Sequence, residues 1–207
     1  EREYLNRLVD RGASTIFLQF DGVTDDVYQY TRGANLMQLK VDAINNCAEA
    51  KIGVILVPTL VPGVNDHQLG DIVQFAKQWV PTVKGIHFQP VSYFGRYPVA
   101  PEDKDRLTMP DVIDGLVRQT GGELKSENFL PRRYKDAHCA FSSLFILTED
   151  RKLLPTAKAL TEQLVSGWGG YRRAPWESAR SFMNPHWRYN EGKPAPCSTG
   201  SGGPSPG

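Results

Sequence analysis

The sequence has few cysteines and no excess of charge of either sign. Three cysteines in 207 residues, Cys47, Cys139 and Cys197, are too few and too scattered for a disulfide framework, which fits a reducing compartment. The formal net charge is +1, from 24 basic and 23 acidic residues, so composition gives no reason to expect nucleic acid or an anionic membrane as a partner. No apolar run approaches the roughly 20 residues of a membrane span. We therefore expect a cytoplasmic protein with no transmembrane segment and no nucleic-acid partner.

Two common nucleotide-binding motifs are also absent. Nothing in the chain matches the phosphate loop Gly-x4-Gly-Lys-Ser/Thr or the dinucleotide motif Gly-x-Gly-x-x-Gly. Hydrophobic residues nevertheless make up 40% of the chain, which is enough to bury a core.

Short apolar runs alternate with helical periodicity in the first 95 residues. The expected strands are residues 14–20, 52–60 and 85–91, and the expected helices are residues 1–10, 36–51 and 69–79. Continuous apolar strands suit a parallel sheet that is buried on both faces. Alternating strands and helices predict adjacent parallel strands, either in an open sheet or in part of an (α/β) barrel.

The character of the sequence changes after Gly95. Residues 96–104 are rich in proline and charge, residues 109–120 have a helical pattern, and residues 141–147 form another apolar run followed by a turn. From about Ser166 onward Gly, Pro, Trp, Arg and Ser dominate without periodicity. We therefore expect an α/β part over residues 1–95, a small α+β region over residues 96–165 and a disordered tail over residues 166–207.

Polar side chains end each of the three predicted strands. Gln19 and Asp21 end the first, Thr59 ends the second, and His87 and Gln89 end the third. Ligands of parallel α/β proteins bind beyond the carboxyl ends of the strands, so these residues suggest one shared site. His87 and Gln89 share a face at period two. We expect that face to point away from the helices, because an unpaired polar group against aliphatic side chains costs roughly 1 to 3 kcal/mol.

Local explanations compete with this site. Asp21 also fits a turn residue that bonds its own backbone, and Asn65-Asp66 fits an N-cap of the helix that follows. Arg32 either presents its guanidinium at the same end of the sheet or lies in a solvated loop. Gly22 and Gly63 suit a sharp turn or a close approach of the backbone to a ligand.

The cysteines give a weaker signal. Cys47 lies on the apolar stripe of its predicted helix, so we expect it in the core. Cys139 follows His138 and fits either a half-buried packing residue or a metal ligand, although one thiolate makes no site.

Residues 15–95 resemble the later β-α units of radical S-adenosylmethionine (radical SAM) enzymes, in the branch similar to archaeal tetraether lipid synthases and pterin-methylating enzymes. The segments that carry the resemblance are Leu18-Gln19-Phe20-Asp21-Gly22, Arg32-Gly33, Val57-Pro58-Thr59, Gly63-Val64-Asn65-Asp66 and His87-Phe88-Gln89-Pro90. The resemblance implies a partial (β/α) radical SAM barrel. It also implies that Gln19 and Asp21 approach the ribose or methionine part of S-adenosylmethionine, that Thr59, Gly63 and Val64 approach the adenine, and that His87 and Gln89 face the reaction.

The iron–sulfur motif of that family, Cys-x3-Cys-x2-Cys, does not occur in the chain. We therefore expect a C-terminal fragment that is inert alone. The resemblance implies that the intact protein binds S-adenosylmethionine and a [4Fe-4S] cluster, accepts electrons from a ferredoxin or flavodoxin, and abstracts hydrogen from a small-molecule, lipid or peptide substrate. Cys139 matches a position where relatives carry further cluster cysteines. The alternative is another (α/β)-barrel enzyme or a noncatalytic module that binds a small metabolite.

Overall fold

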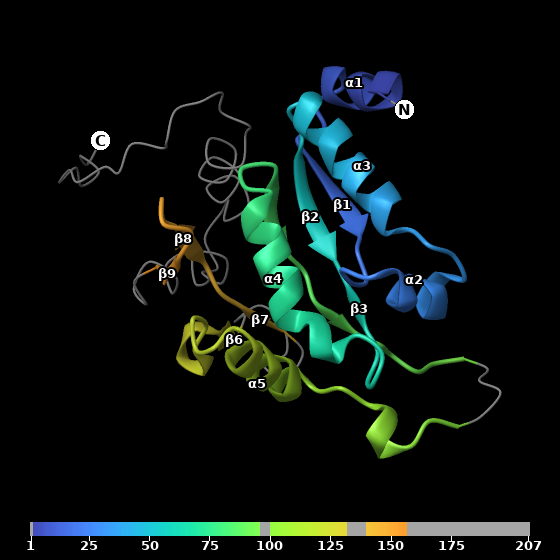
Figure 1. Cartoon of the computed structure of the whole chain (residues 1–207), viewed down its shortest axis with the longest axis vertical. Helices are drawn as coiled ribbons and strands as arrows, with labels where there is room; N and C mark the ends of the chain where they lie inside the picture. Colours follow the sequence, from blue (N-terminus) through green and yellow to red (C-terminus); the bar gives the residue numbers. More distant parts are fainter. Residues whose placement is uncertain (1, 96–99, 132–139, 157–207) are drawn as a thin grey trace, which may run out of the picture.

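The structure is a computed structural model that describes residues 2–95, 100–131 and 140–156 (Figure 1). Five α-helices occur in these ranges: α1 (Arg2–Asp10), α2 (Asp25–Arg32), α3 (Met37–Glu49), α4 (Leu69–Gln78) and α5 (Met109–Gln119). The strands are β1 (Thr15–Gln19), β2 (Gly53–Val57), β3 (Thr59–Leu60), β4 (Val83–Ile86), β5 (Gln89–Pro90), β6 (Leu130–Pro131), β7 (Phe141–Ser142), β8 (Phe145–Leu147) and β9 (Leu153–Pro155). The expected tail over residues 166–207 and Cys139 lie outside the described residues.

A parallel sheet with the order β1-β2-β4 forms the centre of the fold. Thr15 to Gln19 pair in register with Gly53 to Val57, and β2 pairs in parallel with β4. Beyond the β2 end, β3 pairs in parallel with β5, so that Thr59 lies beside Gln89. The prediction of three adjacent parallel strands in the first 95 residues is confirmed.

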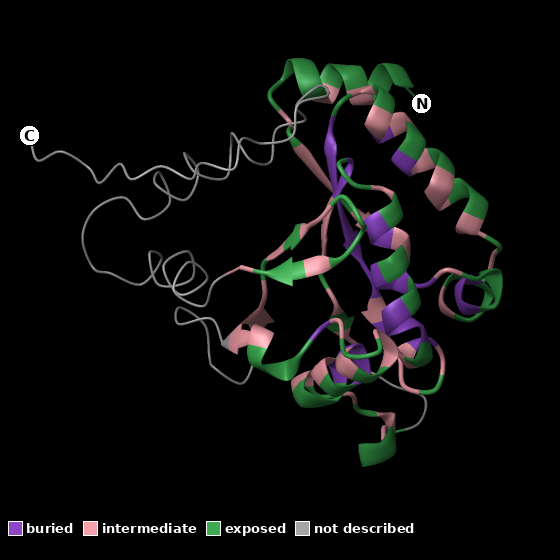
Figure 2. Ribbon diagram, turned by 60° about the vertical axis from the view of Figure 1, so that its left-hand side comes forward, coloured by how far each residue is buried: buried purple, intermediate pink, exposed green. Residues whose placement is uncertain are grey.

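Helices α3 and α4 cover one face of this sheet. The buried cluster on that face contains Ile44 and Cys47 of α3, Val54 and Leu56 of β2, and Ile72 of α4. In Figure 2 the buried residues follow the central strands and the side of α4 that faces them. Burial of these aliphatic side chains supplies the main stabilisation of the sheet. Cys47, which is 4% exposed, is a core residue as the sequence predicts.

Three expected elements differ from the structure. Residues 25–32, which are not among the expected helices, form helix α2, which buries Val27 and Tyr28 and ends at Gly33 in the left-handed conformation. The run over residues 52–60 is two strands, because Pro58 lies between β2 and β3 and has no backbone N–H for a ladder bond. The third run is likewise divided into β4 and β5.

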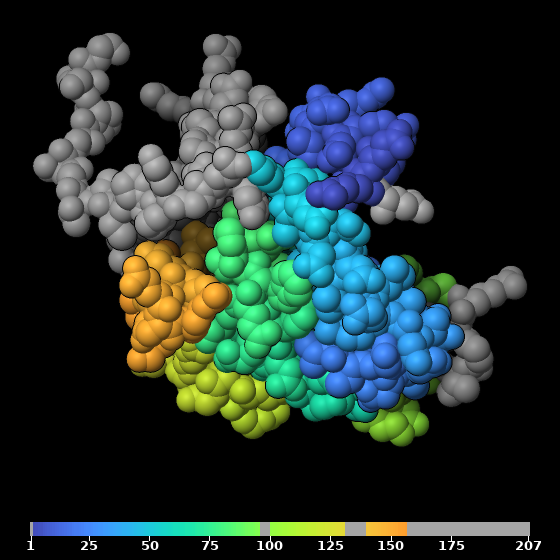
Figure 3. Space-filling view, turned by 45° about the horizontal axis from the view of Figure 1, so that its top comes forward, coloured from blue at the N-terminus to red at the C-terminus, as the bar shows by residue number. Residues whose placement is uncertain are grey.

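The region after Gly95 packs on the other side of α4. A second buried cluster joins Leu60, Leu69 and Val73 to Val112 and Leu116 of α5, and Phe145 and Leu153 of the β8–β9 hairpin pack against it. Figure 3 shows the hairpin (orange) lying against α4 (green). Helix α5 begins with a capping box, in which the Thr108 hydroxyl accepts from Asp111 N and the Asp111 carboxylate accepts from Thr108 N.

Among the described residues, no helix combines the length and the apolar character that a membrane crossing needs.

Candidate functional site

A buried carboxylate lies at the carboxyl ends of β1 and β2. Asp21 is 0% exposed, and its Oδ1 accepts hydrogen bonds from Gln19 Nε2 at 2.6 Å and from Thr59 N at 3.1 Å. Its Oδ2 accepts from Arg32 Nε at 2.7 Å and lies 3.3 Å from the Thr31 hydroxyl. Gln19 Nε2 also donates to the Thr59 hydroxyl at 3.0 Å. The carboxylate therefore connects β1, the start of β3 and α2 at one point.

The charge of Asp21 is stabilised in this position. Burial raises the pKa of the carboxyl, but hydrogen bonds from Arg32, Gln19 and the Thr59 backbone lower it further than burial raises it, so the pKa lies below its ordinary value. The hydrogen bond to Asp21 correspondingly raises the pKa of Arg32. Asp21 is thus an ionised group whose two oxygens already have protein donors.

Arg32 reaches this end of the sheet from α2 rather than from a solvated loop. Its side chain is 39% exposed, and only Nε is bonded to Asp21 in the part of the chain that the structure describes. Lys40 of α3 lies close enough to sense the charges of both Asp21 and Arg32, while partial burial lowers its pKa. Arg32 is therefore the cation that contacts the buried carboxylate, and Lys40 adds a second positive charge within electrostatic range.

The predicted strand-end residues His87 and Gln89 lie on the sheet face opposite α3 and α4. Ile86 and Phe88 pack into the helix-side clusters, so His87 and Gln89, which are exposed, lie on the other face, as the sequence predicts. Gln19 and Thr59 are half-buried, and Gln89 lies beside Thr59 in the β3–β5 pair. His87 donates its backbone N–H to Leu56 O at 2.7 Å. The structure thus brings the five predicted strand-end residues to one end of the sheet.

Gly63 and Val64 lie in the turn after β3. Gly63 has φ of +72° and donates its N–H to Asp66 Oδ1 at 3.0 Å, and Val64 N donates to Val61 O at 3.1 Å. The hydrogen bonds that the structure describes for Gly63 and Val64 all lie within this turn. These bonds do not connect the turn to Gln19 and Thr59, which bond each other directly.

Two residues of the same turn were missed by sequence reasoning. Asn65 was interpreted as a helix cap, but its side chain makes no capping bond and turns back to the strand ends, where Nδ2 donates to Asp21 O and Thr59 O. Gln68 had no signal in the sequence, yet its amide bonds the segment after β1. The sequence gives no signal that separates Asn65 from an ordinary helix cap; its complete burial in the structure does.

Gly22 lies against the Gln68 amide. A Cβ at position 22 would lie 2.6 Å from Gln68 Oε1 and 3.0 Å from Val27 Cγ1. The close approach that the sequence predicts for Gly22 is therefore to a protein side chain.

No group of three or more His, Cys, Asp or Glu residues that could hold a metal ion occurs in residues 2–95, 100–131 and 140–156. The proposed ligand Cys139 lies outside those ranges. The described part of the site thus consists of one buried carboxylate, its cationic partner Arg32 and neutral hydrogen-bonding groups.

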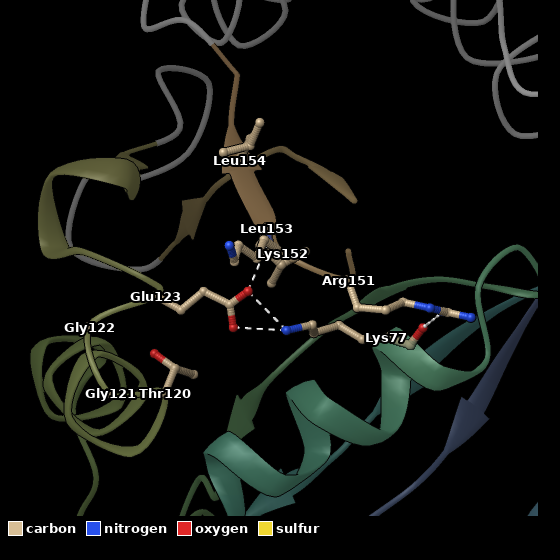
Figure 4. A pocket seen from close by; sticks show the side chains of 9 residues that line it. All are labelled: Lys77, Thr120, Gly121, Gly122, Glu123, Arg151, Lys152, Leu153 and Leu154. Carbon is tan, nitrogen blue, oxygen red and sulfur yellow. Dashed lines mark hydrogen bonds and ion pairs between the residues drawn. The ribbon is translucent and has the colours of Figure 1, made fainter. Parts of the chain in front are cut away.

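A second polar cluster lies at the other end of α4 (Figure 4). Glu123 accepts from Lys77 Nζ with both oxygens at 2.9 Å and from Leu153 N at 2.8 Å, while Arg151 donates to Lys77 O at 2.6 Å. These bonds line an open hollow and hold the β8–β9 hairpin to α4. The hollow contains none of the residues that the sequence assigned to ligand binding.

Comparison with known proteins gives one informative similarity. No protein-family model matches the chain. The chain is 38% identical over 178 residues to 7,8-dihydro-6-hydroxymethylpterin dimethyltransferase of Methanocaldococcus jannaschii, and the match covers 75% of this chain. It covers 35% of the relative, so the chain spans about a third of the length of the curated protein that it resembles. The chain is therefore similar to one part of a pterin-modifying enzyme.

Proposed function

We propose that this chain supplies the S-adenosylmethionine-binding strand ends of a radical SAM protein. The observation that carries the proposal is the meeting of Gln19, Asp21, Thr59 and Gln89 at the carboxyl end of a parallel sheet. The similarity to a pterin dimethyltransferase supports it, because that similarity extends over three quarters of the chain.

The polar groups at the strand ends fit a nucleoside that carries a charged substituent. Gln19 and Thr59 offer an amide and a hydroxyl that are half-buried, and Gln89 offers a second amide that is exposed. Such groups pair with ribose hydroxyls, ring nitrogens and amino groups. Asp21 has no exposed surface and both of its oxygens are engaged, so its part in binding is to hold Gln19, Thr59 and Arg32 in place.

The described residues do not fit an iron–sulfur cluster, because they contain no set of thiolate or imidazole ligands. In the proposal this chain binds and orients S-adenosylmethionine, and the reductive cleavage belongs to the whole protein. The substrate of that whole protein is a small molecule of the pterin class, a choice supported by the name of the relative.

The test is the binding of S-adenosylhomocysteine, a stable analogue, to the 207-residue chain by equilibrium dialysis. We expect saturable binding that S-adenosylmethionine displaces and ATP does not. Gln19→Ala should weaken it about 2- to 12-fold, because a neutral hydrogen bond contributes roughly 0.5 to 1.5 kcal/mol.

Gln78→Ala is the matched control, since Gln78 is an exposed glutamine at the far end of α4. Its affinity should equal that of the wild type. Absence of saturable binding by the wild-type chain would overturn the proposal and favour a site for a different small metabolite.

A further inference from the structure

The turn between β3 and α4 carries two buried carboxamides. Asn65 is 0% exposed and Gln68 is 4% exposed. Asn65 Nδ2 donates to Asp21 O at 2.8 Å and to Thr59 O at 2.7 Å, and its Oδ1 accepts from Val61 N at 2.7 Å. Both amide hydrogens and the amide oxygen of Asn65 are therefore used on backbone atoms.

Gln68 makes the equivalent connection one turn later in the chain. Its Oε1 accepts from Val23 N at 2.9 Å, and its Nε2 donates to the Thr24 hydroxyl at 2.6 Å. Both amides thus join the chain that follows β2 to the chain that follows β1.

These connections matter because the ladder between β1 and β2 has ended at this point, and β3 pairs with β5 instead of with the chain after β1. The β1–β2 pairing ends at Gln19 and Val57, with one further bond from Phe20 N to Val57 O. Beyond it, the backbone at Asp21 and the backbone at Thr59 are bridged by the Asn65 amide and by the Asp21 carboxylate. The spacing between Gln19 and Thr59 is therefore held by their direct bond, by the Asp21 carboxylate and by a side chain 44 residues after Asp21.

We propose that Asn65 is a positioning residue of the ligand site: its amide fixes the two strand ends relative to each other, so that Gln19 and Thr59 meet the ligand in one arrangement. Asn65 has no exposed surface and touches no ligand itself. The inference rests on the proposed function. A site whose groups are already in place binds more tightly than one that must be ordered on binding.

Asn65→Ala tests this role. We expect S-adenosylhomocysteine to bind the folded variant at least 5-fold more weakly than the wild type, although no ligand contact has been removed. Two controls separate positioning from stability. Asn45→Ala makes the same change on the exposed face of α3, and Cys47→Ala removes packing from the core on the same helix.

A merely structural role predicts that Asn65→Ala behaves like Cys47→Ala, with lower resistance to urea and an unchanged dissociation constant below the unfolding transition. That result would overturn the inference and leave the proposed function standing. Absence of binding by the wild type would instead overturn the proposed function, and the inference with it.

A double-mutant cycle sharpens the test. If Asn65 acts partly through Gln19, Asn65→Ala should weaken binding less in the Gln19→Ala background than in the wild type. The same fold-change in both backgrounds would contradict action through Gln19.

If Asn65→Ala fails to fold, Gln68→Ala provides the second variant, because it removes the companion connection to the chain after β1 and so loosens the turn that holds the Asn65 amide in place. We expect at least a 2-fold loss of affinity for that variant. An unchanged affinity would contradict the role of the turn.

Discussion

Asp21 and Glu123 are two carboxylates that accept the same three kinds of donor in different regions of the molecule. Each is bonded by a cationic side chain, by a backbone N–H and by a glutamine amide. The donors to Asp21 are Arg32, Thr59 N and Gln19, and the donors to Glu123 are Lys77, Leu153 N and Gln74. In both cases the bonds lower the pKa more than burial raises it.

The two carboxylates differ in burial and in the location of their partner side chains. Asp21 is fully buried, and its partners Gln19 and Thr59 belong to the open face of the sheet. The side chain of Glu123 is 20% exposed, and its partners belong to the β8–β9 hairpin and to the surface of α4. The same set of bonds therefore holds the strand ends of the proposed ligand site in one region and docks two segments in the other.

The largest expected effect comes from removing the cation in each region. Arg32→Met leaves a fully buried carboxylate without its counter-ion, so we expect a loss of about 3 to 5 kcal/mol in the free energy of unfolding. Lys77→Met should cost less, about 1.5 to 3 kcal/mol, because Glu123 still contacts water. Urea denaturation of both variants measures the difference. Equal losses would mean that burial does not distinguish the two carboxylates.

The packing of α5 against α4 connects the two regions, and Gly70→Ala should disturb both. A Cβ there would lie 2.6 Å from Gln119 O, a backbone atom, while Gln119 itself bonds Gly70 N and Asp66 O. We expect a loss of about 1 to 3 kcal/mol in thermal or urea unfolding.

Gly115→Ala is the control for this close contact. Its Cβ would meet Leu69 Cδ1 at 2.6 Å, the end of a side chain that can move. A smaller loss than that of Gly70→Ala is expected, and the reverse order would contradict the role assigned to the Gln119 backbone.

Glu123→Gln should separate docking from binding. The variant keeps the size of the side chain but loses its charge, so we expect about 1.5 to 3 kcal/mol less stability and faster amide hydrogen exchange over residues 145–155. Affinity for S-adenosylhomocysteine should not change. A weakened affinity would show that the hairpin contributes to the site.

The smallest expected effect is a change with pH in the stability difference between the wild type and Glu123→Gln. Because the folded pKa of Glu123 lies below its ordinary value of 4.5, the stabilisation from its charge is present above pH 4.5 and is lost as pH falls through the folded pKa. The stability difference between wild type and Glu123→Gln should therefore narrow in acid. A constant difference between pH 7 and pH 3 would contradict the ionised state of Glu123.

The parallel sheet and part of the site follow from short-range patterns. Gln19, Asp21 and Thr59 each follow a buried apolar run, and the geometry of parallel strands brings such residues together. Helix α2 was missed because it buries only Val27 and Tyr28, which leaves little apolar periodicity to detect.

The long-range contacts could not be predicted in the same way. The local rule for Asn65 favours a helix cap, and the turn overrides it by directing the amide to the strand ends. Glu123 bonds Lys77 and Leu153, which are 46 and 30 residues away, and no local pattern relates them. Side chains that connect separate elements are therefore the part of the site that needed the structure.

The contact between Gly22 and Gln68 restricts which amino acids the chain accepts at position 22. Because the space for a Cβ is occupied by the Gln68 amide, every side chain larger than hydrogen displaces that amide and releases Val23 N and the Thr24 hydroxyl. In a library randomised at position 22 and selected for folding, glycine should dominate the survivors. Exceptions should carry a second substitution at position 68 that shortens the side chain, so the two positions would vary together.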